Sequence, residues 1–122
     1  MIVYGGRPGL RNTPASAEVW QFDTTTSGWS FVGQGPGPRF DHTSALLDGI
    51  LYVFGGFSGT AVLGDMWKCD IATTTWSQIL DVPVPPRYGH MSAAVNGHVY
   101  ILGGSDLTGD LSDAWSYNVE LG

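Results

Sequence analysis

The chain has 122 residues and a formal net charge of −6, and only 13% of its residues are charged, so no basic stripe is available to neutralise a phosphate backbone. Its one cysteine, Cys69, can form no internal disulfide, and no apolar run approaches the roughly 20 residues that span a bilayer. We therefore expect neither a nucleic acid nor a membrane partner, and a cytoplasmic location.

Every element that the sequence predicts is a β-strand. The opening MIVYGG ends in a diglycine and predicts a strand over residues 1–6. The loop 7–17 follows, then a strand that carries Trp20 and Phe22 on one face, then a short strand over WSFVG at 29–33.

The same elements return twice, each time preceded by one further strand. RFDHTSALL at 39–47 leads through Asp48-Gly49, a dipeptide typical of two-residue hairpins, into ILYVFGG at 50–56. DMWKCD at 65–70 and WSQIL at 76–80 complete this set. The third set has RYGHMSAAV at 87–95, Asn96-Gly97, HVYILGG at 98–104 and DAWSYN at 113–118.

These sets form an internal repeat of about 48 residues. Arg39 and Arg87, His42 and His90, and Gly56 and Gly104 are each 48 residues apart. The repeat predicts three units: residues 1–35 without a first strand, 36–83 complete, and 84–122 without a last strand. The repeating positions, which we interpret as structural, are Gly5, Gly6, Trp20, Trp29, Arg39, His42, Gly55, Gly56, Trp67, Trp76, Arg87, His90, Gly103, Gly104 and Trp115.

Four short antiparallel strands per unit of this length indicate an all-β fold of β-propeller blades. The diglycine Gly55-Gly56, the downstream Cys69 and Trp76, and the PR..H motif at Pro38, Arg39 and His42 together resemble the kelch repeat family. One departure is Cys69, where an aromatic residue is usual. The resemblance implies a kelch-type propeller, of which about two and a half to three blades are present.

So few blades cannot close a ring, since propellers close with roughly four to eight. Three hypotheses follow: the chain is a fragment of a longer propeller, it self-associates to close one, or it is an open array. In all three, repetition favours a structural role for His42 and His90. No C-x-x-C or H-E-x-x-H motif exists, so we expect no metal site, no cofactor and no catalytic residue.

Function is expected in the parts that do not repeat. Connections between the second and third strands of a blade, and between one blade and the next, emerge on one face and carry the long loops 7–17, 57–64 and 105–112. Variable loops on a rigid scaffold commonly bind partners, and the kelch resemblance implies a protein or peptide partner. The candidate binding residues are Arg7, Arg11, Phe57, Leu63 and Asp106.

The predicted function is thus a non-catalytic protein-interaction module. The alternative is a fragment of a propeller enzyme that resembles galactose oxidase or the iron-dependent specifier proteins. Against the specifier proteins, neither Glu18 nor Glu120 has an Asp four residues on, as their E-x-x-x-D-x-x-x-H arrangement requires.

Overall fold

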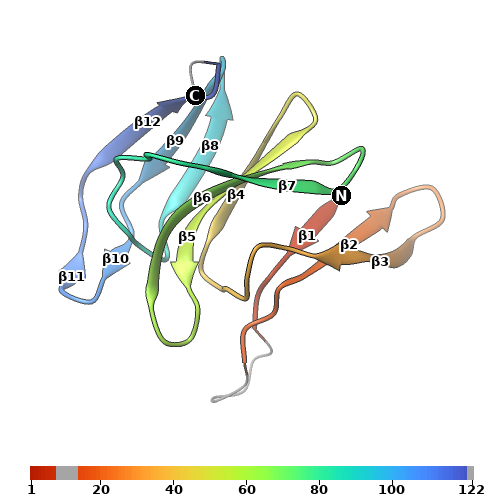
Figure 1. Ribbon diagram of the computed structural model, residues 1–122, viewed down its shortest axis with the longest axis horizontal. Helices are drawn as coiled ribbons and strands as arrows, with labels where there is room; N and C mark the ends of the chain where they lie inside the picture. The colour runs from red at the N-terminus through yellow and green to blue at the C-terminus, as the bar shows by residue number, and fades with distance from the viewer. Residues whose placement is uncertain (8–13, 121–122) are drawn as a thin grey trace.

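The computed structural model describes residues 1–7 and 14–120, which form β-strands and connecting turns and contain no helix. Three antiparallel sheets follow one another along the chain and lie side by side (Figure 1). The first sheet has the order β1-β2-β3, the middle sheet β4-β5-β6-β7 and the last sheet β12-β9-β8, and β10 and β11 form a separate hairpin. The strands are β1 (Ile2–Tyr4), β2 (Glu18–Asp23), β3 (Gly28–Gln34), β4 (Thr43–Leu47), β5 (Ile50–Phe57), β6 (Val62–Asp70), β7 (Thr75–Ile79), β8 (Met91–Val95), β9 (His98–Leu102), β10 (Ser105–Asp106), β11 (Gly109–Asp110) and β12 (Ala114–Asn118). The predicted all-β fold of propeller blades is therefore confirmed.

The two predicted hairpins form at the predicted dipeptides. Leu47 pairs with Ile50 across Asp48-Gly49, whose φ angles are 51° and 77°. Val95 pairs with His98 across Asn96-Gly97, with φ angles of 51° and 75°. Two consecutive positive φ angles define the type I′ turn, whose twist matches that of the flanking strands.

The strands expected to start at Arg39 and Arg87 are shorter than predicted. β4 begins only at Thr43 and β8 only at Met91. Asp41 and Gly89 adopt positive φ angles of 55° and 65°, and this interrupts the extended backbone that a strand requires. Before each interruption one residue makes an isolated bridge instead, Phe40 to Phe57 at the end of β5 and Tyr88 to Ser105 at the start of β10.

The diglycines mark a close approach between segments. β5 continues through Gly55-Gly56, with a register shift between Phe54 and Gly56. A Cβ at Gly56 would lie 2.8 Å from Cβ of His42, and one at Gly104 would lie 2.8 Å from Cβ of His90. Only glycine allows the start of the inner strand to pass this close.

Apolar side chains fill the two spaces between the three sheets. The first cluster, centred on Tyr4, Val19, Leu51, Val53 and Cys69, joins the first sheet to the middle one. The second, which includes Ala45, Tyr52, Phe54, Met66, Val99 and Ile101, joins the middle sheet to the last. Each sheet therefore packs one face against its neighbour in the manner of successive propeller blades.

Candidate functional site

Arg39 and Arg87 are the most buried charged residues that the structure describes, and each pairs with an aspartate of its own sheet. The guanidinium of Arg39 donates to both carboxylate oxygens of Asp65 at 2.8 Å and to the carbonyl of Gly55 at 3.0 Å. Arg87 binds Asp113 at 2.6 and 2.8 Å and the carbonyl of Gly103 at 2.9 Å. This bidentate geometry is the strong, directional form of the ion pair.

The same aspartates orient the tryptophans of the third blade strand. Asp65 accepts the indole N–H of Trp67 at 2.7 Å, and Asp113 accepts that of Trp115 at 2.6 Å. Burial by itself would raise the pKa of Asp65, but the hydrogen bonds from Arg39 and Trp67 outweigh it and hold that pKa below its usual range. Hydrogen bonds from Arg87 and Trp115 likewise lower the pKa of Asp113.

The backbone of each arginine reaches the preceding sheet. The N–H of Arg39 donates to Ser16 at 3.2 Å, and its carbonyl accepts the N–H of Gly6 at 2.8 Å. The N–H of Arg87 donates to Leu63 at 3.2 Å, and its carbonyl accepts the N–H of Gly56 at 2.8 Å. Each arginine thus binds one sheet with its side chain and the previous sheet with its backbone.

The repeated histidines lie between sheets and are uncharged at neutral pH. His90 Nε2 lies 2.7 Å from the hydroxyl of Thr43 and its ring packs on Phe54 of the middle sheet. Burial, with the charge of Arg87, lowers the pKa of His90 to about 4. Burial also lowers the pKa of His42, whose ring lies 5.2 Å from that of Tyr4.

The long loops gather on one side of the molecule. In Figure 1 the connection between β5 and β6 and the hairpin β10-β11 extend to the same side, while the β4-β5 and β8-β9 turns point to the opposite side. We call the first side the long-loop face. Of the residues that the sequence analysis selected for binding, Phe57 and Leu63 border the β5-β6 connection and Asp106 lies in the hairpin.

Three half-buried aromatic rings form a row along this face. The ring of Phe40 lies 5.6 Å from that of Phe57 in an edge-to-face arrangement, and Phe57 lies 5.8 Å from Tyr88. Backbone bonds fix the row, because Phe40 and Phe57 exchange N–H···O bonds of 3.0 and 2.8 Å, and Tyr88 exchanges two of 2.9 Å with Ser105. We refer to Phe40, Phe57 and Tyr88 as the aromatic row.

The exposed guanidinium of Arg7 ends the row, 4.3 Å above the centre of the Phe40 ring. This is the geometry of a cation–π contact. Beside it lies a groove of about 410 Å³, lined by Arg7, Pro14, Ala15, Pro38, Phe40, Ser58, Gly59 and Thr60. A second hollow of about 280 Å³ is lined by Val62, Pro85, Pro86, Asp106, Leu107 and Thr108.

The five candidate binding residues have different surroundings. Arg7 and Phe57 belong to the arrangement around the aromatic row, and Arg11 lies outside the described residues. Leu63 is half-buried. Asp106 lines the second hollow and also closes the β10-β11 turn, because its Oδ1 accepts bonds from the N–H and hydroxyl of Thr108 and the N–H of Gly109. These bonds lower its pKa.

Sequence reasoning missed Phe40, Tyr88 and Leu107. The first two follow the arginine of the two PR..H motifs, so an aromatic residue at a repeated position was an available signal. This signal does not stand out in the sequence, because residues 39–47 and 87–95 are predicted to be strand throughout and aromatic residues are common in strands. Leu107 is 78% exposed at the tip of the unpredicted hairpin β10-β11, where no sequence pattern marked it.

The described residues hold neither a metal-binding cluster nor a membrane-spanning helix. Within residues 1–7 and 14–120, no three His, Cys, Asp or Glu side chains are grouped so that they could hold a metal ion. Across that same portion of the chain, there is no helix long and apolar enough to cross a membrane.

The fold and the repeated arginine, histidine and diglycine contacts define a repeat protein built of β-propeller blades. The chain matches a family model described as the KLHDC2/KLHL20/DRC7 Kelch-repeats domain over residues 1–121. The chain therefore belongs to the Kelch repeat family, whose members are typically protein-interaction modules.

Similar curated proteins carry the same repeat. An F-box/kelch-repeat protein of Arabidopsis thaliana is 37% identical over 81 residues, which is 64% of this chain and 19% of that protein. Kelch domain-containing protein 3 of Rattus norvegicus is 33% identical over 85 residues, 65% of this chain and 22% of that protein. Host cell factor of Drosophila melanogaster is 30% identical over 96 residues, 65% of this chain and 6% of that protein. The chain thus spans less than a quarter of each of these relatives.

Proposed function

We propose that this chain is a non-catalytic module that binds an extended segment of a partner protein on its long-loop face. The observation that carries the proposal is the aromatic row of Phe40, Phe57 and Tyr88, which ends at the exposed charge of Arg7. Aromatic and arginine side chains are the residues most enriched at energetic centres of protein interfaces.

The two hollows give the face positions where partner side chains can be held. The groove beside Arg7 combines apolar Pro38 and Phe40 with the hydroxyls of Ser58 and Thr60. The second hollow presents Leu107 and two prolines beside the carboxylate of Asp106. Apolar surface with a few placed polar groups is the usual composition of a recognition site.

Backbone bridges and buried ion pairs hold the scaffold under the face. The backbone bridges at Phe40 and Tyr88 are continuous with the buried ion pairs of Arg39 and Arg87. A partner therefore meets a backbone that is already held in place under the aromatic row, which reduces the entropy lost on binding.

Selection of peptides from a random displayed library, followed by calorimetry on purified chain, tests the proposal. Peptides that bind the long-loop face should lose about tenfold or more in affinity to an Arg7→Gln or Leu107→Ser variant, as expected for contacts at the centre of an interface. Lys68→Gln and Val95→Ser serve as matched controls, because Lys68 and Val95 are exposed on strands away from this face. Peptides that bind all four variants equally would show that the face has been assigned wrongly.

The non-catalytic part of the proposal has its own test. Elemental analysis of the purified chain should find neither copper nor iron in stoichiometric amount. Either metal at one equivalent would contradict the proposal and favour a propeller enzyme. The cytoplasmic location stays a prediction, which fractionation of cells that express the chain would check.

A further inference from the structure

The turn between β8 and β9 contains the one Asn-Gly dipeptide of the sequence, Asn96-Gly97. The backbone nitrogen that follows an asparagine can attack its side-chain carbonyl, and glycine has no side chain to shield this nitrogen. At the other two asparagines, Asn12 and Asn118, the following residues are a threonine and a valine, which are branched at Cβ. The sequence thus marks Asn96 as the most reactive asparagine, provided that the fold leaves its turn accessible.

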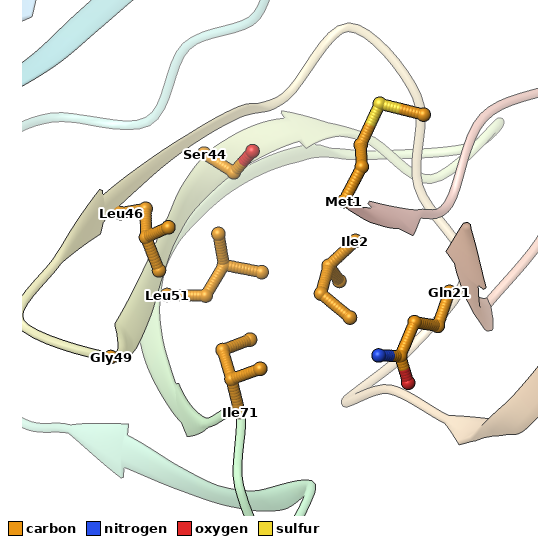
Figure 2. A pocket seen from close by; sticks show the side chains of 8 residues that line it. All are labelled: Met1, Ile2, Gln21, Ser44, Leu46, Gly49, Leu51 and Ile71. Atoms are coloured by element: carbon orange, nitrogen blue, oxygen red, sulfur yellow. The ribbon is translucent and has the colours of Figure 1, made fainter. Parts of the chain in front are cut away.

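The fold does leave this turn accessible. Asn96 is exposed at the end of the hairpin. The equivalent turn, Asp48-Gly49, belongs to the middle sheet, which has a packed sheet on each side, and both of its residues are exposed as well. Gly49 is labelled in Figure 2, in the turn that joins β4 to β5. The exposure of Asn96 is therefore a property of this kind of turn and does not come from its place in the last sheet.

The N–H of Gly97 is available to react. Within residues 14–120, the hydrogen bonds of the turns use the carbonyl of Gly97, which accepts the N–H of Val119 at 3.0 Å, but not the N–H of Gly97. The N–H that follows Asn118 is that of Val119, so it is already engaged. The side chain of Asn118 is also held, because its Oδ1 accepts the N–H of Glu120 at 2.9 Å. The nitrogen beside Asn96 is thus unengaged, whereas the nitrogen beside Asn118 is bonded.

The backbone of Asn96 resists the reaction only weakly. Its φ angle of 51° lies in the left-handed region, which is intrinsically unfavourable for residues other than glycine. Formation of a ring between Gly97 and the asparagine side chain requires the backbone to rotate out of this conformation. Opening the terminal pair of Val95 and His98 allows that rotation, and Val95 is already 49% exposed. Local opening at such a hairpin end uncovers little apolar surface and needs little free energy.

We propose that Asn96 is a self-modification site, at which the side-chain amide is lost by deamidation. The nitrogen of Gly97 gives its proton to a solvent base and forms a bond to Cγ of Asn96. The bond from Cγ to Nδ2 breaks, and Nδ2 takes a proton from water and leaves as ammonia. A second water molecule then opens the succinimide ring. Its addition at Cγ yields an aspartate at position 96, and its addition at the backbone carbonyl yields an isoaspartate.

The two products have different effects on the hairpin. An aspartate fits the turn, because Asp48 occupies the equivalent position with the same φ angle of 51°. An isoaspartate adds a methylene to the backbone of a two-residue turn, and this disturbs the pairing of β8 with β9. Val99 and Ile101 of β9 are 2% and 0% exposed in the cluster between the middle and last sheets. The isoaspartate therefore loosens the packing of these sheets, so the reaction limits the lifetime of the native fold.

This site is independent of the function proposed above. The β8-β9 turn points away from the long-loop face (Figure 1). Water is the only co-reactant, and neither step changes an oxidation state. Deamidation would therefore proceed whether or not the long-loop face binds a partner.

Incubation of the folded chain in neutral buffer, with peptide mapping by mass spectrometry at successive times, tests the proposal. Aspartate and isoaspartate should accumulate at position 96 at least about tenfold faster than at position 118, where the attacking nitrogen is bonded. Asp48→Asn places a second Asn-Gly dipeptide in the equivalent turn, and position 48 of this variant should convert at a similar rate.

Asn96→Asp is the control for the structural consequence. This variant should unfold at the same urea concentration as freshly prepared wild type. Wild type that has accumulated isoaspartate should unfold at a lower urea concentration. The variant kept for the same time should change much less, because a carboxylate is a poorer electrophile than an amide.

Two results would overturn the proposal. One is conversion at position 96 that is no faster than conversion at position 118. The other is conversion that occurs in chain unfolded by urea but not in folded chain, which would show that the turn protects the asparagine.

Discussion

Replacing Asp65 with asparagine removes one charge of a buried ion pair while keeping the shape of the side chain. Asp65 accepts two hydrogen bonds from Arg39 at 2.8 Å and one from Trp67 at 2.7 Å. An asparagine carries an NH2 group in place of one carboxylate oxygen. That NH2 group would face an arginine N–H group, and two donors cannot bond to each other. At least one bond is lost, and the guanidinium of Arg39, which is 2% exposed, keeps its charge without a counterion.

Removing one partner of a buried pair costs about 3 to 5 kcal/mol, because the remaining charge stays desolvated. The carboxylate of Asp65 is 26% exposed, so water can still reach the pair, and we expect about 3 kcal/mol. Urea unfolding followed by tryptophan fluorescence measures this loss directly. Asp70→Asn is the matched control, because Asp70 is exposed and its bond to the N–H of Ala72 can also be made by an asparagine.

The pH dependence gives a second check. Because the folded pKa of Asp65 lies below its unfolded value, the pair stabilises the fold fully above a pH of about 4. That contribution is lost as the pH falls through the folded pKa. The difference in the free energy of unfolding between wild type and Asp65→Asn should therefore become smaller under acid conditions. If the free energies of unfolding of Asp65→Asn and Asp70→Asn differ by less than about 0.5 kcal/mol at neutral pH, as for two surface substitutions, the role assigned to the pair is wrong.

Three further predictions concern single residues. His90 has a folded pKa of about 4, so the unfolded chain takes up its proton first as the pH drops. The free energy of unfolding should therefore fall between a pH of about 6.5 and about 4, by up to roughly 3 kcal/mol. Urea unfolding at several pH values should show this dependence on pH, and a His90→Gln variant with the same dependence would disprove it. Cys69 is buried, and burial raises the pKa of its thiol, so labelling by a thiol reagent should be slow until denaturant is added, and immediate labelling of folded chain would contradict the packing described. Gly49 has a φ angle of 77° with open space around it, so Gly49→Ala should lower the free energy of unfolding by about 1 kcal/mol from backbone strain alone. Gly28→Ala is the comparison, because Gly28 lies outside the positive-φ region. Equal losses in the two variants would refute the turn assignment.

The repeat made most of the fold predictable. Hairpins at Asp48-Gly49 and Asn96-Gly97 and the strands around Trp67 and Trp115 follow from local chemistry that one blade shares with the next. Strand starts were less accessible, because Asp41 and Gly89 adopt positive φ angles, a conformation that both residue types tolerate but that neither requires. The hairpin β10-β11 has two residues per strand, too few to give a pattern.

The candidate site was only partly predictable. Loop length and variability pointed to Arg7 and Phe57. Phe40 and Tyr88 complete the row that contains Phe57. A backbone bridge joins Phe40 to Phe57, and another joins Tyr88 to Ser105, so each bridge connects residues 17 positions apart along the chain. The pairing of Arg39 with Asp65 spans 26 residues, and no single-sequence pattern states which acid an arginine will meet. Contacts of this range form only when the strands of a sheet are brought side by side.

Arg39 and Arg87 join two kinds of stability that are usually separable in repeat proteins. In a linear array, the total free energy is a sum of an intrinsic contribution from each unit and a coupling between nearest neighbours. The side chain of Arg39 contributes to the first through Asp65 and Gly55, while its backbone contributes to the second through Ser16 and Gly6. A blade that loosens around its arginine therefore also releases its neighbour, so unfolding should spread from blade to blade as one cooperative transition.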